Sequence, residues 1–206
     1  MAHATVSEVA TANSCFRKIG VKQTIGSFDE GTAAANFASA RYFELRDDLL
    51  RSHPWNFATK RAKMAKLSTG PTTPADWNYF QLPDDWLRTL AIHDNDAAIG
   101  TGLEYYEEDG KISAGREEAW IRYVYGVTDP NSMPPDFRES LAFSMAIEAA
   151  IDLVGSRSLS EMMAERFITK LRQAKSTDSM SDGPRMLPRG SWVGQRFRSS
   201  PTVITS

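Results

Sequence analysis

The first fifty residues alternate apolar and polar positions with helical spacing. Apolar residues three or four apart predict an amphipathic helix over residues 5–19, and Gly20 offers a stop. Its stripe consists of Val6, Val9, Ala12, Phe16 and Ile19. A second stripe predicts a helix over 32–53, which Pro54 ends because the residue before a proline disfavours helical geometry. Its inner face comprises Ala34, Ala38, Tyr42, Leu45 and Leu49.

The pattern changes to β-type over residues 55–127. We predict strands over 55–67, where a short helix is the alternative, and over 87–92. Residues 103–106 and 111–113 flank the acidic sequence Glu107-Glu-Asp-Gly110, which predicts a hairpin turn. Bulky β-formers make residues 119–127 the clearest strand. The middle of the chain is therefore expected to be an antiparallel β-rich insertion.

Helical spacing returns after Pro134 and predicts helices over 134–154 and 158–175. The first is almost wholly apolar apart from one thin polar line, formed by Ser140, Ser144, Glu148 and Asp152, so it should be buried on most sides. The second should begin with a capping box between Ser158 and Glu161. Its expected core contacts are Met162, Phe167, Leu171 and Ala174. The predicted fold class is α+β: a bundle of four helices with an inserted antiparallel β region.

The last thirty residues are rich in Ser, Gly, Pro and Arg and have no apolar period. Such a stretch cannot offset its ordering entropy by local burial. We therefore divide the chain into a folded body, residues 1–178, and an extended C-terminal arm, residues 179–206. The arm's aromatic and basic side chains indicate a segment that orders against a partner. Its expected contact residues are Arg185, Arg189, Trp192, Arg196 and Phe197.

Composition limits the partners and the cellular compartment that we expect for the protein. A net charge of -2 argues against a chain built for phosphate backbones, and 41% hydrophobic residues suffice for a core. One cysteine, Cys15, allows no internal disulfide and fits a reducing cytoplasm. The first residues lack the features of a signal peptide, and the best apolar run, 141–147, is too short to cross a bilayer. We expect no membrane association.

Motifs for chemistry are sparse. His3, His53 and His93 have no metal-ligand spacing, and no phosphate-binding loop or nucleophile elbow occurs. We therefore expect no catalytic residue, no metal and no cofactor. Adjacent acids occur at 47–48, 84–85, 107–108 and 117–118, but neighbours in sequence point to different sides and do not form a facing catalytic pair. Glu107, Glu108 and Asp109 could instead face a channel that conducts DNA, where negative walls avoid binding phosphates.

Several phrases of the sequence occur together in a recognisable order. Residues 13–21 end in Phe16-Arg-Lys-Ile-Gly-Val21, and residues 40–58 end in His53-Pro-Trp-Asn-Phe-Ala58. Tyr79-Phe-Gln-Leu-Pro-Asp-Asp-Trp-Leu-Arg88 follows, then Tyr123, Asp129-Pro130 and the apolar helix 137–150. Over about residues 6–175 the chain resembles the tail tubular protein A family, the head-to-tail adaptors of short-tailed phages. It departs from the pattern at Trp86, where the family often has cysteine.

The resemblance implies a structural role in the virion. Twelve copies would form a ring beneath the portal protein, retain the packaged genome, provide the platform for the tail tube or nozzle, and let double-stranded DNA leave through the bore. The location would be the head-tail junction, after assembly in the host cytoplasm. Apart from the resemblance, we expect Trp55, Phe57 and Leu82 to be core residues that join helices to sheet rather than direct portal contacts. Arg41 and Arg46 are expected to pair with acids on their own helix, such as Glu44, Asp47 or Asp48.

Two other classes stay open at the level of sequence. A tail-associated glycan hydrolase would use two of the acids. A small DNA-binding packaging factor would use the arm, where Trp192 between Arg189 and Arg196 could stack on a base. Four arginines in such a tail would bind DNA weakly and with strong salt dependence, whereas Trp192 as an anchor in a protein groove uses the same residues better.

Overall fold

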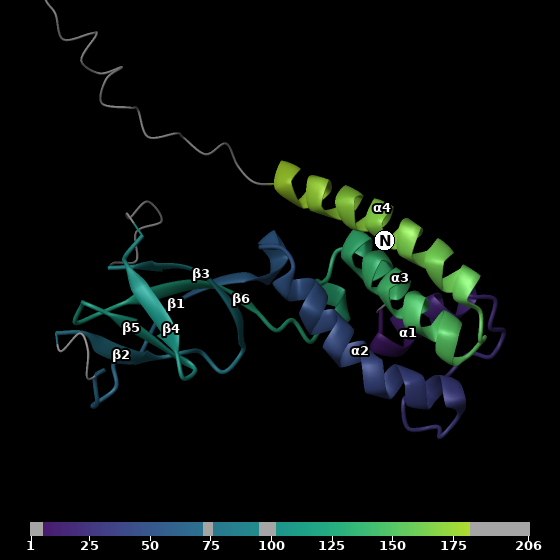
Figure 1. Ribbon diagram of the computed structural model, residues 1–206, viewed down its shortest axis with the longest axis horizontal. Coiled ribbons are helices and arrows are strands. Elements are labelled where there is room, and N and C mark those ends of the chain that lie inside the picture. Colours follow the sequence, from purple (N-terminus) through teal and green to yellow (C-terminus); the bar gives the residue numbers. More distant parts are fainter. Residues whose placement is uncertain (1–5, 72–75, 95–101, 182–206) are drawn as a thin grey trace, which may run out of the picture.

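The chain folds into a helical lobe and a β lobe, which Figure 1 shows at opposite ends of the molecule. The computed structural model describes residues 6–71, 76–94 and 102–181. Within these ranges it contains four α-helices and two three-stranded antiparallel sheets, so the expected mixture of helix and antiparallel sheet is confirmed. The helices come from the two ends of the described chain, and the strands lie between them in sequence.

The first two helices begin at side-chain caps. Helix α1 spans Glu8–Lys18, and the hydroxyl of Ser7 accepts a hydrogen bond from the Ala10 amide. Helix α2 spans Ala33–Arg51 and is capped in the same way by Thr32. It ends two residues before the predicted position. The buried residues of α1 are Thr11, Ala12, Cys15 and Phe16. Val6 and Val9, which belong to the predicted apolar stripe, are only half-buried. The buried face of the helix is therefore rotated by about one position from the predicted stripe.

Helix α3, Pro135–Asp152, packs against α1, α2 and α4. Its predicted polar line is wrong at Ser140, which is fully buried. The Ser140 hydroxyl donates to the Asp136 carbonyl oxygen at 2.8 Å, so the polar group is satisfied within the helix and can face the core. The outermost apolar residue is Ile151, which is 54% exposed.

Helix α4 spans Arg157–Met180 and differs from its prediction at both ends. Its cap is Ser156, whose hydroxyl accepts from the Leu159 amide, and the predicted capping box at Ser158 is wrong. Met163 is buried in place of Met162, while Phe167 and Leu171 are partly buried against the core and Ala174 is buried. The helix continues past residue 175, so residues 176–180 are helical and the boundary at 178/179 falls inside α4.

The β lobe contains two sheets. The first has the order β1-β6-β3, with bounds Thr59–Lys63, Trp120–Tyr125 and Trp86–His93. The second has the order β2-β5-β4, with bounds Asn78–Gln81, Lys111–Ala114 and Tyr105–Glu108. A 3₁₀ turn over Asn56–Ala58 precedes β1. Within the predicted range 55–67, the short-helix alternative is therefore right for residues 56–58 and the strand for residues 59–63. Strand β2 was not predicted.

The β4–β5 hairpin closes more tightly than expected. Only Asp109 and Gly110 form the turn, with φ values of 50° and 66°, as a two-residue type I′ turn requires. Glu107 and Glu108 belong to β4 and pair with Ile112 and Lys111. Two of the three acidic residues therefore lie on the edge strand β4, and the third, Asp109, lies in the turn.

Each lobe has its own core, and the lobes are joined through β6 and the segment that follows it. Val124 and Val127 belong to the helical core, which also includes Trp55 and Phe137. The smaller core of the β lobe lies around Phe80, Ile92, Ile112 and Ile121. The two lobes consequently share a continuous junction at the ends of α2 and β6.

Candidate interaction surfaces

The phrase His53-Pro-Trp-Asn-Phe57 forms the junction between α2 and the β lobe. Trp55 is 2% exposed, and its indole N–H donates to the Leu49 carbonyl oxygen at 3.0 Å. Its ring packs edge-on against Phe137 of α3, with 5.2 Å between centroids, and tilted against Phe57 at 6.0 Å. One side chain thus fixes the end of α2, the start of α3 and the turn before β1, as expected for Trp55.

Asp178 holds the last turn of α4 against the same junction. One carboxylate oxygen lies 3.1 Å from Nε2 of His53, and the carboxylate also accepts from the Asn56 amide at 3.0 Å. The Asn56 side chain donates to the Asp178 carbonyl oxygen at 2.7 Å. His53 is therefore part of a structural contact. We call these three residues, His53, Asn56 and Asp178, the α4 clasp.

A small pocket of about 90 Å³ lies beside the α4 clasp. Its apolar wall is formed by Trp55, Pro134, Phe137 and Ala174, and its polar rim by Asp136, Thr177, Asp178 and Ser181. We call it the terminal pocket because Ser181 is the last described residue of the chain. Sites for small-molecule ligands usually measure about 300–1,000 Å³. The terminal pocket has the size of one aliphatic side chain.

The phrase Leu82-Pro-Asp-Asp85 places Asp85 in the turn just before β3, within reach of β1 and β6. Its carboxylate accepts from Lys60 and from the Tyr123 hydroxyl, each at 2.8 Å. Partial burial alone would raise the pKa of Asp85, but these two hydrogen bonds outweigh it, so the pKa is lowered. Burial first, and the hydrogen bond to Asp85 second, raise the pKa of Tyr123. The group is therefore an ion-paired brace between β1, β6 and the turn before β3.

The other acidic pairs have partners of their own. Glu117 pairs with Lys66, Glu118 with Lys63 at 2.6 Å, and Asp47 with Arg46 at 2.8 Å. Arg46 is only 7% exposed and lies over the Phe43 ring, a burial that its sequence context did not reveal. Arg41 pairs with Glu44 on its own helix, as expected, and also with Glu148 of α3.

The three proposed channel-facing acids lie together at the hairpin end of the β lobe, and all are exposed. Glu107 accepts from the Thr89 hydroxyl at 2.9 Å, and Glu108 from the Tyr79 hydroxyl at 3.1 Å. Asp109 pairs with Lys111 across the turn, a contact whose hydrogen bond and charge lower the pKa of Asp109. These acids form a solvent-facing acidic edge whose charge is partly balanced by one lysine.

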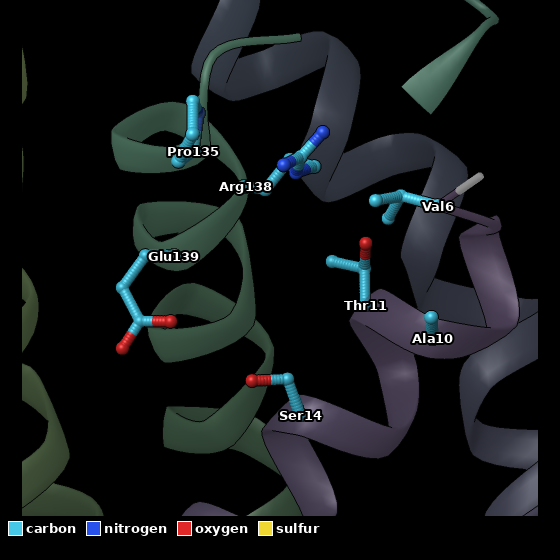
Figure 2. A pocket seen from close by; sticks show the side chains of 7 residues that line it. All are labelled: Val6, Ala10, Thr11, Ser14, Pro135, Arg138 and Glu139. Carbon is cyan, nitrogen blue, oxygen red and sulfur yellow. The ribbon is translucent and has the colours of Figure 1, made fainter. Parts of the chain in front are cut away.

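A shallower pocket of about 250 Å³ lies between α1 and the start of α3 (Figure 2). Thr11 and Ser14 reach it from α1, and Pro135, Arg138 and Glu139 from the first turns of α3. Glu139 is bound by Lys18 at 2.5 Å, and Arg138 donates to the Pro130 carbonyl oxygen at 3.0 Å. Behind it, burial raises the pKa of Tyr42 to about 12, so its hydroxyl stays protonated. The charged groups of this pocket already have partners within the fold.

The exposed side of α4 carries apolar residues on both flanks. Met162 is 44% and Ile168 55% exposed. At about 100° of rotation per residue, they fall on opposite sides of the buried line marked by Met163 and Ala174. On the Met162 flank, Arg166, Thr169 and Gln173 continue at helical spacing into a shallow groove of about 540 Å³ that Phe143 also lines. Ile151 and Val154 add exposed apolar surface at the turn between α3 and α4.

Five predicted contact residues, Arg185, Arg189, Trp192, Arg196 and Phe197, lie outside the described residues. Within residues 6–71, 76–94 and 102–181, no group of three or more potential metal ligands comes together. No helix in the described part of the chain is long and apolar enough to cross a membrane.

The terminal pocket and the α4 clasp were not predicted, because the last helix was expected to end at residue 175 and in fact continues to Met180. A signal was present: Ala174, Asp178 and Ser181 continue the inner face of α4 at spacings of four and three.

No protein-family model matches this chain, and no curated protein matches it.

Proposed function

We propose that this chain is a phage virion structural protein, a head-to-tail adaptor whose copies form a ring under the portal protein. In this role the ring retains packaged DNA, carries the tail tube or nozzle and conducts double-stranded DNA at ejection. The body would be a four-helix bundle with its β insertion, and residues beyond α4 would act as the arm. The protein would be located at the head-tail junction of the virion, after assembly in the host cytoplasm.

The observation that carries the proposal is the placement of the two most distinctive sequence phrases. His53-Pro-Trp-Asn-Phe57 builds the junction of the lobes, and Leu82-Pro-Asp-Asp85 builds the Lys60–Asp85–Tyr123 brace. Both phrases that resemble the adaptor family therefore have a structural task in this fold. A rigid connection between a helical body and a β region suits a subunit that transmits force between two assemblies.

Ring closure requires two different surfaces on each subunit, because a head-to-tail contact pairs one face with another. The two flanks of α4, marked by Met162 and Ile168, supply such a pair of partly apolar faces. Repetition around a ring strengthens individually modest contacts. The acidic edge of Glu107, Glu108 and Asp109 is suited to the bore, where it would repel the DNA backbone.

Electron microscopy of the purified full-length chain mixed with portal complexes tests the proposal. We expect rings, twelvefold by the family resemblance, stacked on the portal. Met162→Asp and Ile168→Asp should each abolish rings while far-UV circular dichroism stays unchanged. Ser176→Asp, an equal charge change on the outer side of the same helix, should leave rings intact. A wild-type chain that stays monomeric beside portal complexes would overturn the proposal.

A further inference from the structure

The terminal pocket combines an aromatic wall with an unmatched negative charge. Trp55 and Phe137 are almost fully buried behind it, so its wall is rigid. Asp178 on its rim is occupied by the α4 clasp. Asp136, also on the rim, has no ion-pair or hydrogen-bond partner for its carboxylate among the described residues. Such a pocket fits an aliphatic side chain with a basic residue close by in sequence.

We propose that the terminal pocket binds Leu187 of the same chain, with an arginine two residues away, Arg185 or Arg189, against Asp136. The chain leaves the pocket's own rim at Ser181, only six residues before Leu187. Six residues span at most about 20 Å, which is ample for a return to the rim. Asp182-Gly183-Pro184 is a strong turn signal and favours a reversal of direction directly after α4.

Charge and size both favour this occupant. From Gly183 to Ser206 the chain carries four arginines and no acid, which complements Asp136 and Asp178. A volume of about 90 Å³ equals the share of about three water molecules in the liquid, which matches the four carbons of a leucine side chain better than the larger indole of Trp192. Trp192 is thereby left for another partner. A short tether also gives Leu187 an effective concentration in the millimolar range, which no segment of a separate copy matches.

The contact would act as an internal latch on the arm. It would hold residues 185–189 against the body and leave residues 192–197 available, so a partner that needs the whole arm must first displace Leu187. This inference concerns the free chain and does not depend on the adaptor role. Its failure and the failure of the proposed function are therefore separable.

Disulfide trapping in the full-length chain tests the latch. Thr177→Cys on the rim is combined with Met186→Cys, next to Leu187, and the protein is oxidised at low micromolar concentration. Cys15 can stay, because burial raises its pKa to about 12 and keeps it unreactive. We expect an intrachain disulfide that forms at least tenfold faster than in a control pair, Glu165→Cys with Met186→Cys, since Glu165 is exposed on α4 away from the pocket.

A third substitution shows whether Leu187 binds in the pocket or whether residue 186 simply comes near residue 177 because the two are close in sequence. Leu187→Asp in the trapped pair should slow the intrachain disulfide at least tenfold, whereas Val193→Asp should not change its rate. Equal rates in the two cysteine pairs, or no effect of Leu187→Asp, would overturn the proposal. Disulfide-linked dimers in place of intrachain products would show that a second copy is the occupant, and would also overturn it.

Discussion

The helical lobe and the β lobe differ in how much of their stability can come from apolar burial. The helical core contains 27 buried hydrophobic residues and the β core only nine, so most of the apolar burial stabilises the helices. Beside its much smaller core, the β lobe carries four lysine–acid pairs, Lys60–Asp85, Lys63–Glu118, Lys66–Glu117 and Lys111–Asp109. Exposed pairs of this kind stabilise a fold only weakly, because water and salt screen them. We infer that the β lobe is the weaker lobe and that its stability depends more on salt and acid.

The largest effect is expected from Trp55→Ala at the junction. The substitution removes the largest fully buried side chain and its hydrogen bond to Leu49, and should lower the free energy of unfolding by about 3–5 kcal/mol. Urea unfolding followed by far-UV circular dichroism measures the loss. Trp77→Ala is the matched control, because Trp77 is half-buried on the β lobe and stacks on the exposed Tyr106. A comparable loss in both variants would contradict the central role of Trp55.

Ile112→Ala tests whether the β lobe can open by itself. Ile112 is fully buried in the smaller core, so its truncation should cost about 2–4 kcal/mol. Hydrogen exchange should accelerate in β2, β4 and β5 while α1 and α3 keep their protection. The exposed Ile151→Ala serves as the control. Uniform acceleration across both lobes would mean that the two lobes unfold as one unit.

Asp178→Ala should release the end of α4 from the junction. It removes the contacts to His53 and Asn56, and we expect a loss of about 1–2 kcal/mol. Hydrogen exchange should rise in residues 174–181 and leave the first turns of α4 unchanged. Asp152→Ala, at the exposed end of α3, should have neither effect.

Asp85→Asn should have the smallest effect and should depend on pH. Because the pKa of Asp85 is lowered in the folded protein, its stabilisation is complete above the ordinary carboxyl pKa of about 4 and is lost as the pH falls through the lowered value. Since the side chain is 38% exposed, we expect a loss of about 1 kcal/mol or less at pH 7. The difference from the unmodified protein should shrink in urea titrations as the pH falls below the ordinary carboxyl pKa. A difference that persists in acid would assign the effect to packing.

The sequence predicted the helices best where apolar residues repeat over several turns. The stripe of α2 and the run of α3 are long enough to outweigh local ambiguity. The predicted polar face of α3 was wrong where a polar residue has a partner within the helix. Ser140 is buried because its hydroxyl donates to the carbonyl oxygen of Asp136, four residues earlier. The end of α4 was missed because Ser176, Thr177 and Ser179 are poor helix formers, and contacts of Asp178 with a distant turn compensate for them.

Short strands were harder to predict because they, too, depend on contacts with distant residues. Strand β2 has four residues, too few for a period, and exists because its backbone pairs with β5 more than thirty residues later. The hairpin turn was predicted correctly at Asp109-Gly110, where two positive φ values demand those residue types. The candidate surfaces were predicted least well. Pockets such as the terminal pocket depend on which side chains meet from separate elements, and a single sequence does not show this.

The order of elements also affects how a ribosome can make this protein. Helix α1 packs mainly against α3, whose first residue lies more than a hundred positions later, and α3 in turn packs against α4. During vectorial synthesis at about 5–20 residues per second, the buried face of α1 must wait several seconds for its partner. A nascent chain halted within the strands would present Phe16 and Leu50 to the solvent. Chaperone dependence should therefore peak before α3 emerges and decline once it docks.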